Sequence, residues 1–230
     1  FEIVIEENLE TRAHDILEKY YYENMKSLND FKEQIPPLPA KKITPVLIVL
    51  ALLMIHLGCE YAGVHKNIIL EYGSSALYIL QGEYYRIFTA LMLHADIEHL
   101  AGNIAGILIF GIPLCTITGS IQGFCLLAAS GAAGNLINAW MYRTAHLSIG
   151  ASTSVMGAAG LLVAFQMKKK AAVKGFKPSI FLPLGAGAAL VGMLSGGENT
   201  DVSAHIFGFA SGLVMGGLVS FFVWIKEAKQ

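Results

Sequence analysis

The sequence has few charged residues, and this shortage limits its structural class. Only 14% of the 230 residues are Asp, Glu, Lys or Arg, whereas a soluble domain carries about a quarter. Hydrophobic residues make up 54% of the chain. This composition excludes an ordinary water-soluble domain. It predicts a multi-pass membrane protein surrounded by the lipid bilayer, with no nucleic-acid partner.

Patterns for metal binding and for aspartyl proteolysis are also lacking. Glu98-His99 does not belong to a His-Glu-x-x-His motif, and no acidic residue stands at a zinc-like spacing from His94 or His205. The apolar stretches contain no pair of carboxylates, which an aspartyl protease needs. The three cysteines lie in or beside apolar stretches, without metal-ligand or disulfide spacing: Cys59, Cys115 and Cys125. We therefore expect neither a metal ion nor a cofactor.

The first 40 residues differ in composition from the rest. They hold nine acidic and four basic side chains, and apolar residues at near-helical spacing within 1–35 predict a short helix. Pro36-Pro37-Leu38-Pro39 then breaks any helix. We therefore divide the chain into an acidic cytoplasmic segment with a proline-rich linker at 1–40 and a membrane core at 41–230. Because the chain begins with Phe1, we expect the natural N-terminus to lie upstream.

Six later stretches approach the roughly 20 apolar residues that a helix needs to cross a bilayer. They cover residues 44–62, 97–113, 121–141, 151–167, 178–195 and 202–225. The connection at 63–95 is long and amphipathic, which predicts a loop half immersed in the outer leaflet. A seventh, poorly formed span is the alternative. The expected fold is an all-α bundle of six transmembrane helices with a membrane-embedded first loop.

Basic residues predict the orientation of this bundle. Most lysines flank alternate loops and the C-terminus: Lys41, Lys42, Lys168, Lys169, Lys170, Lys174, Lys177, Lys226 and Lys229. By the positive-inside rule, both termini are expected in the cytoplasm. The second, fourth and sixth helices then begin on the outer side, with His99, Ser152 and His205 in their first turns. We expect these three residues at one shallow depth, within reach of external water.

His99 and Asn103 share one helical face because they are four residues apart. As hydrogen-bond donors to a developing oxyanion, such groups contribute about 2.7–4 kcal/mol each to catalysis. Hydrogen bonds between helices, which would merely hold the bundle together, are the alternative.

Ser152 follows Gly150-Ala151 at the start of the fourth apolar stretch. A serine at this position is either a nucleophile or a helix cap, and caps are the more common case. Thr153 and Ser154 are competing hydroxyls. The pattern is not the Gly-x-Ser-x-Gly elbow of α/β-hydrolases, because Ser154 occupies the position of the second glycine.

His205 shares its helical face with Gly208 and Gly212, which allow a neighbouring helix to approach closely. If His205 lies within hydrogen-bond reach of Ser152, its neutral imidazole would act as a general base. The alternative is that His205 has a purely structural role. Asp201 stands only at the edge of this span, so a Ser–His dyad is favoured over a triad. The remaining histidines lack a partner pattern, and most of them are expected at the surface or the interface: His14, His56, His65 and His146.

Together these motifs resemble the rhomboid family of intramembrane serine proteases. The matching stretches are Gly82-Glu-Tyr-Tyr-Arg86-Ile-Phe-Thr-Ala-Leu-Met-Leu-His94, His99-Leu-Ala-Gly-Asn103, Gly150-Ala-Ser152 and Ala204-His205-Ile-Phe-Gly208-Phe-Ala-Ser-Gly212. The resemblance implies a nucleophile at Ser152 and a general base at His205. It also implies an oxyanion hole formed by His99, Asn103 and the backbone amide of Ser152.

The resemblance assigns supporting roles to six further residues: Arg86, His94, Gly150, Met156, Gly208 and Gly212. His94 is expected to support the loop before the second helix, and Arg86 belongs to the aromatic–Arg signature of the first loop. Gly208 and Gly212 are expected where the fourth and sixth helices touch.

Two positions depart from the family pattern. Thr153 stands where glycine often follows the nucleophile, and we expect it to alter the turn and crowd the oxyanion site. Met156 replaces an aromatic residue that packs against the catalytic imidazole, although methionine is adaptable enough to substitute as a packing surface. These departures predict a competent enzyme that is slower or differently selective.

The expected function is therefore cleavage of transmembrane or juxtamembrane segments of single-span membrane proteins. The resemblance places this enzyme in a bacterial inner membrane, with its active site open to the extracytoplasmic side. One alternative is a rhomboid-like pseudoprotease that binds transmembrane helices, although the chain keeps both Ser152 and His205. The other is a small-molecule transporter, although the polar residues lie near one surface and no internal repeat is apparent.

Overall fold

The computed structural model describes residues 12–20, 43–171, 178–194, 196 and 200–227. The chain divides into two units, Phe1–Pro39 and Ala40–Gln230. In the first unit, residues 12–20 form a helix, in the region where the apolar spacing predicts one. The rest of the predicted helical region 1–35 and the proline-rich linker at 36–39 lie outside the described residues. All the predicted site residues belong to the second unit.

Helices follow all six predicted spans of the second unit. The first is α2 (Ile43–Tyr61), and the second combines α6 (Ile97–Gly106), the π-helix η4 (Ile107–Gly111) and α7 (Ile112–Thr118). The others are α8 (Ser120–Tyr142), α9 (Ser152–Ala171), η5 (Pro178–Phe181) with α10 (Leu182–Leu194), and α11 (Val202–Glu227). The predicted all-α membrane bundle is confirmed.

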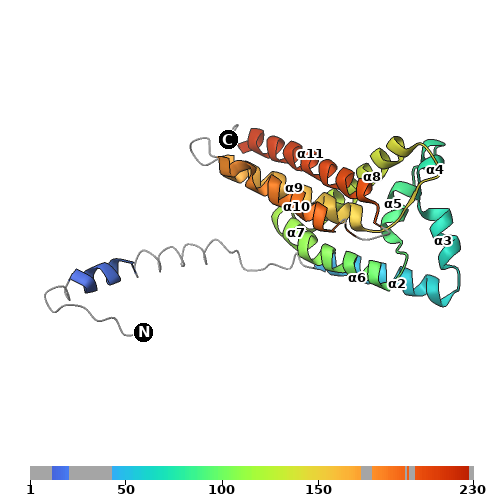
Figure 1. Cartoon of the computed structure of the whole chain (residues 1–230), viewed down its shortest axis with the longest axis horizontal. Coiled ribbons are helices and arrows are strands. Elements are labelled where there is room, and N and C mark those ends of the chain that lie inside the picture. Colours follow the sequence, from blue (N-terminus) through green and yellow to red (C-terminus); the bar gives the residue numbers. More distant parts are fainter. Residues whose placement is uncertain (1–11, 21–42, 172–177, 195, 197–199, 228–230) are drawn as a thin grey trace. The chain divides into compact units, whose positions relative to one another are not determined.

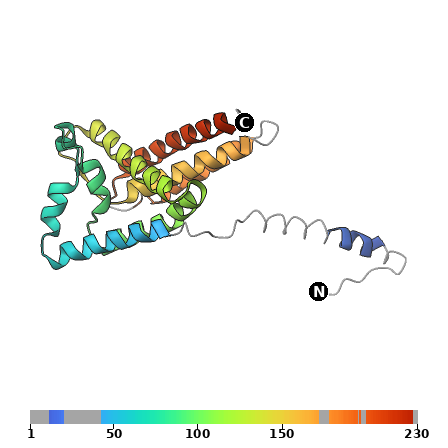
Figure 2. The same ribbon diagram turned by 180° about the vertical axis from the view of Figure 1, so that it is seen from behind.

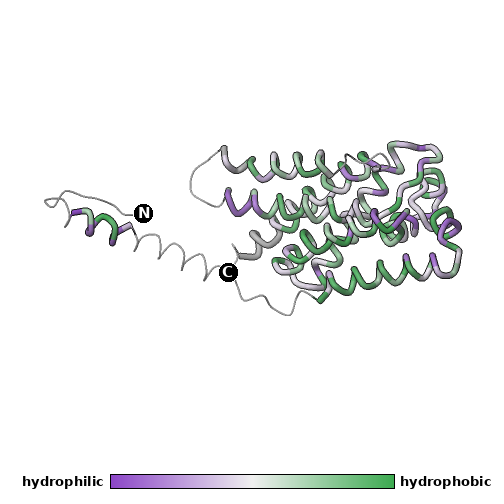
Figure 3. Tube along the Cα trace, turned by 60° about the horizontal axis from the view of Figure 1, so that its bottom comes forward, coloured by the Kyte–Doolittle hydropathy of each residue, from purple (hydrophilic) through white to green (hydrophobic). Residues whose placement is uncertain are grey.

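Among the described residues, four helical stretches are long and apolar enough to cross a membrane. They are Ile43–Tyr61, Ile97–Thr118, Ser120–Tyr142 and Val202–Phe221. The other two helices do not meet this criterion. The last turn of α9 contains three lysines, and α10 has only 13 residues. Figure 3 shows hydrophobic residues along the helices, with hydrophilic residues gathered toward their ends.

Three helices that carry site residues begin at the same end of this unit. Figure 1 shows the starts of α6, α9 and α11 on the side where α3 and α4 also lie. The helices α9 and α11 run side by side, and α8 crosses them (Figures 1 and 2). The first turns of the three helices therefore lie at one end of the bundle.

The connection between the first two spans folds into short pieces. These are α3 (His65–Tyr72), β1 (Ser74–Ser75), α4 (Ala76–Leu80), α5 (Arg86–Thr89) and the 3₁₀-helix η3 (Ala90–Met92). The longest has eight residues, so the alternative of a seventh span is wrong. Several large apolar side chains of this connection are exposed: Leu70, Leu77, Tyr78, Leu80, Tyr84, Tyr85 and Phe88. Such a surface suits the headgroup region of a bilayer.

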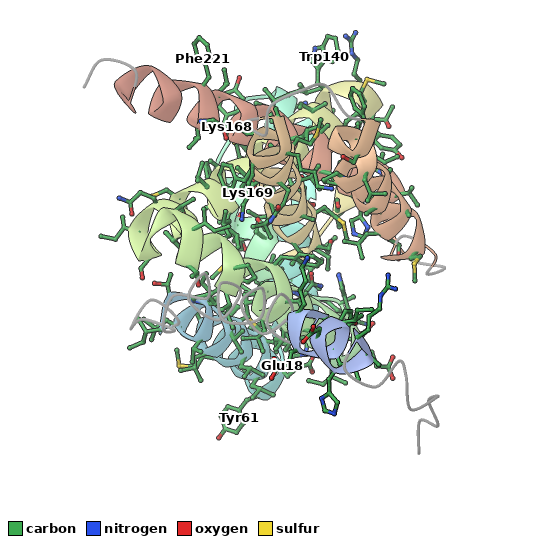
Figure 4. The ribbon with its side chains drawn as sticks, turned by 90° about the vertical axis from the view of Figure 1, so that its left-hand side faces the viewer. Glu18, Tyr61, Trp140, Lys168, Lys169 and Phe221 are labelled. Carbon is green, nitrogen blue, oxygen red and sulfur yellow. The ribbon has the colours of Figure 1, made fainter. Side chains whose placement is uncertain are left out.

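The end of the bundle at which α9 ends carries lysines. Figure 4 shows Lys168 and Lys169 there, and the Lys168 ammonium donates a hydrogen bond to the Ser220 carbonyl of α11.

Tyr61 and Trp140 point outward from the ends of α2 and α8 and are 97% and 57% exposed (Figure 4). Aromatic side chains of this kind favour the membrane–water interface.

Small residues bring α8, α9 and α11 into direct backbone contact. A β-carbon added at Gly134 of α8 would stand 2.8 Å from the Gly208 backbone nitrogen of α11. One added at Gly212 would meet the Gly157 backbone of α9, with 2.9 Å to its Cα. A β-carbon added at Gly208 would likewise meet the Thr153 backbone of α9. Both glycines therefore lie against the fourth predicted helix.

This contact predicts a difference between two glycines of α11. We expect Gly212→Ala to cost about 1–3 kcal/mol, because the new methyl group must push α11 away from the α9 backbone. Nothing lies within 4 Å of a β-carbon at Gly217, so Gly217→Ala is the control. Alanine favours a helix over glycine by about 1 kcal/mol, and the control should therefore be neutral or stabilising. Thermal unfolding in detergent measures both, and equal midpoints for the two variants would contradict the packing argument.

Candidate active site

The segment before α9 is fastened to the first loop on one side. Its short strand β2 (Leu147–Ser148) pairs antiparallel with β1, so that Ser74 faces Ser148. The Gly150 N–H donates to the Ala90 carbonyl at 2.9 Å. Gly150 has a φ of +116°, which L-residues with a side chain rarely adopt. The position of Ser152 is therefore set by backbone hydrogen bonds and by a turn that requires glycine.

Burial distinguishes Ser152 from its two competing hydroxyls. Thr153 and Ser154 are 2% and 1% exposed, whereas Ser152 is partly exposed. The Val155 N–H donates to the Ala151 carbonyl at 2.9 Å, so Ala151 and not Ser152 occupies the N-cap position of α9. Ser152 is thus the accessible hydroxyl of the three, and the helix-cap interpretation is wrong.

The side chain of Thr153 points away from the proposed oxyanion site, which it was expected to crowd. Its Cγ2 methyl group lies between α8 and α11, 2.6 Å from a β-carbon added at Gly134 and 3.0 Å from one added at Gly208. The expectation that Thr153 crowds the oxyanion site is therefore wrong, because the side chain fills the contact between helices.

His99 and Ser152 border the same small space beside Gly150. A β-carbon added at Gly150 would stand 2.6 Å from His99 Nε2 and 3.5 Å from Ser152 Oγ. Asn103, one turn further along α6, is 5% exposed and donates through Nδ2 to the His99 carbonyl at 2.8 Å. An amide carries two N–H groups, so a second donor of Asn103 is left for another acceptor.

His94 connects the first loop to α9. Its Nε2 accepts a hydrogen bond from the Ala151 N–H at 3.4 Å, and its ring meets the ring of His99 edge-on, with centroids 5.2 Å apart. His65 Nε2 donates to the His94 carbonyl at 2.8 Å. His94 was expected to support the loop before the second helix, and it also contacts the segment that precedes α9. Burial, together with the neighbouring rings of His99 and His56, lowers the pKa of His94 to about 3.

His205 lies in the first turn of α11 and is 6% exposed. Its backbone N–H donates to the Asp201 carbonyl at 3.2 Å. Gly208, one turn further, lies against the backbone of Thr153, the residue after Ser152. The contact between α9 and α11 therefore brings His205, Ser152 and His99 to one end of the bundle.

Met156 and Arg86 support different parts of the structure. Met156 is 2% exposed and packs in a cluster with Val191 of α10 and Phe209 of α11. Phe209 lies one turn after His205, so Met156 is a packing surface beneath the start of α11. Arg86 is buried in the first loop, where it donates to Glu83 at 2.6 Å and to the Leu70 carbonyl at 3.0 Å.

Sequence reasoning missed a polar cluster around Asp201. His146 Nε2 lies 2.7 Å from Asp201 Oδ2. His14 is exposed and His65 and His146 are partly exposed, as expected for histidines at the surface or the interface, although His65 Nδ1 also has an acidic partner in Glu60 at 2.6 Å. His56 is 6% exposed and does not belong to the surface. Burial alone would raise the pKa of Asp201, but hydrogen bonds from Ser203, His146, Ala204 N–H and Ser148 lower it to about 2. Within the described ranges, no three metal-ligating side chains are grouped to hold a metal ion.

Comparison with known proteins identifies the family. The family model described as the Rhomboid domain matches residues 81–221, which is more than half of the chain. The chain is a member of the rhomboid family. The match begins in the first loop and includes His99, Ser152 and His205. Together with the apolar helices, it makes this rhomboid-family chain an integral membrane protein.

Three relatives agree with this assignment. YdcA of Bacillus subtilis (strain 168), named as a candidate rhomboid protease, is 25% identical over 60% of this chain and 68% of its own length. RHOMBOID-like protein 1 of Arabidopsis thaliana is 29% identical over 58% of the chain, and the mitochondrial RHOMBOID-like protein 6 is 30% identical over 60%. The matched regions span 34% and 45% of these two plant proteins.

The low pKa of His94 predicts part of the pH dependence of stability. An unfolded His94 takes up a proton below about pH 6.5, whereas the folded one stays neutral down to about pH 3, so stability falls as the pH drops below 6.5. At pH 5.5 this contribution is about 1 kcal/mol. We expect His94→Gln to show a smaller drop in unfolding midpoint between pH 7.5 and 5.5 than the wild type. The exposed His14 supplies the control His14→Gln, and an equal drop in all three proteins would contradict the argument.

Proposed function

We propose that this rhomboid-family protein is an intramembrane serine endopeptidase that uses Ser152 and His205 as a catalytic dyad. One observation carries the proposal. Ser152 is the partly exposed hydroxyl at the start of α9, beside His99, while Thr153 and Ser154 are buried. Packing of Gly208 against Thr153 supports the same pairing, because it brings the first turn of α11 to this point.

The proposed reaction assigns one step to each of these groups. His205 accepts the proton of the Ser152 hydroxyl while Oγ attacks the carbonyl carbon of the scissile peptide bond. The negative charge that develops on the carbonyl oxygen is stabilised by donors from His99, from the free N–H of Asn103 and from the Ser152 backbone amide. The protonated His205 then transfers its proton to the leaving amine, and water hydrolyses the acyl-enzyme with His205 again as the base.

The proposed substrates are single-span membrane proteins. A transmembrane helix satisfies all of its backbone hydrogen bonds internally, so a peptide bond must leave the helix before Ser152 can attack it. A segment with helix-destabilising residues and a small side chain before the cleaved bond would meet this requirement. We further propose that both termini lie in the cytoplasm of a bacterial cell, which places the site on the extracytoplasmic side of the inner membrane.

Cleavage of a model single-span substrate by reconstituted protein tests the dyad. We expect Ser152→Ala and His205→Ala to lose cleavage, because loss of either member of a comparable catalytic unit reduces kcat by about 10⁶-fold. Ser154→Ala is the matched control and should cleave like the wild type, since this hydroxyl is buried. Cleavage that survives Ser152→Ala would refute the mechanism. A wild type that crosslinks to the substrate without cutting it would instead be a pseudoprotease.

The oxyanion donors predict a second kinetic result. We expect Asn103→Ala to reduce kcat by about 10²–10³-fold with little change in KM, because the donor acts mainly on charge that develops in the transition state. Steady-state kinetics with the same substrate measure both constants. A rise in KM with an unchanged kcat would show that Asn103 serves ground-state binding alone.

A further inference from the structure

Asp201 forms a hydrogen-bonded bridge immediately before α11. Its Oδ2 lies 2.7 Å from His146 Nε2 and accepts a hydrogen bond from Asn138 Nδ2 at 2.8 Å. Its Oδ1 accepts from Ser203 Oγ at 2.6 Å and from the Ala204 N–H at 3.0 Å. The carboxylate thus joins three parts of the chain: the end of α8, the segment before α9 and the start of α11.

The bridge is reinforced from outside by an aromatic side chain. The Tyr142 ring stacks on the His146 ring with centroids 3.7 Å apart and an interplanar angle of 7°. The Tyr142 hydroxyl is also hydrogen-bonded to Ser203 Oγ at 3.2 Å. His146 is therefore held on one side by the carboxylate and on its face by the ring of Tyr142.

The two ends of the bridge lead directly to the proposed catalytic pair. His146 stands six residues before Ser152, in the segment that β1 and Ala90 fasten. Asp201 stands one helical turn before His205, and its carbonyl accepts the His205 N–H. A shift of Asp201 relative to His146 would therefore move the base relative to the nucleophile.

We propose that Asp201 is a positioning residue, whose bridge to His146 and Asn138 sets the place of the His205 imidazole relative to Ser152. The inference rests on the proposed function of that pair. It assigns Asp201 no contact with the substrate. Because Oδ1 caps α11 and Oδ2 makes the bridge, the two roles of the carboxylate belong to different atoms and can be separated.

The substitution Asp201→Asn separates the helix cap from the bridge. The amide oxygen can still accept from the Ala204 N–H and keep the helix cap, whereas the amide nitrogen would face the donors of Asn138 and His146. We expect kcat per active site to fall about tenfold or more, with KM within twofold of the wild type, because small displacements of catalytic groups carry large rate penalties. The active fraction is counted by labelling Ser152 with a fluorophosphonate, which separates misplaced sites from unfolded protein.

Two further variants complete the test. The double variant Asn138→Asp with Asp201→Asn restores an amide–carboxylate pair with its polarity reversed, and we expect it to recover kcat relative to Asp201→Asn alone. Asp96→Asn is the matched control. Asp96 caps α6 by accepting from the His99 N–H at 2.7 Å, so the same substitution there should leave kcat within twofold.

Each result decides between the two proposals. A kcat per labelled site in Asp201→Asn within twofold of the wild type, or no recovery in the double variant, would overturn the positioning role and leave the dyad intact. A lower active fraction with an unchanged kcat per labelled site would show a purely structural role. A wild type that neither cleaves nor labels at Ser152 would refute the proposed function, and the positioning role would fall with it.

Discussion

The short distance between α9 and α11 is the constraint on which the rest of the structure depends. Lipid gives apolar helices no hydrophobic reason to associate, so membrane helices meet closely where small residues let their backbones touch. Here Gly208 and Gly212 of α11 lie against Thr153 and Gly157 of α9, and Gly134 of α8 closes the same contact. His205 and Ser152 are neighbours of these contact residues in sequence. Any side chain that separated the helices would therefore also separate His205 from Ser152.

A second constraint acts on the segment before Ser152. The segment is held by its pairing with β1, by the Gly150–Ala90 hydrogen bond and by the hydrogen bond between Ala151 and His94. The proposed catalysis by fixed donors requires such preorganisation, because reorientation during the reaction would consume the stabilisation that the donors supply. Burial of Thr153 and Ser154 leaves Ser152 as the accessible hydroxyl. The hydrogen bonds of Asp201 likewise fix the start of α11 relative to this segment.

Much of this arrangement could be predicted from particular residues. Each of the six apolar stretches is helical in the structure, and four of these helical stretches have the length and hydropathy that membrane thickness imposes. The glycine spacing after His205 predicted the contact with the fourth helix. The bridge could not be predicted, because Asp201 and His146 are separated by 55 residues and neither belongs to a local pattern. The position of the Thr153 side chain was predicted wrongly for a related reason. It depends on packing against α8, and the sequence around Ser152 contains no information about that helix.

The sequence by itself determined that this protein is a helical membrane protein and which hydroxyl, imidazoles and amide are candidates for its site. These properties follow from composition and from spacing within single helices, where periodicity decides which residues share a face. Only the tertiary structure decided which of three adjacent hydroxyls is accessible, where the methyl group of Thr153 lies, and that His146 and Asp201 pair. Each of these depends on contacts between helices distant in the chain, and the spacing within one helix carries no information about them.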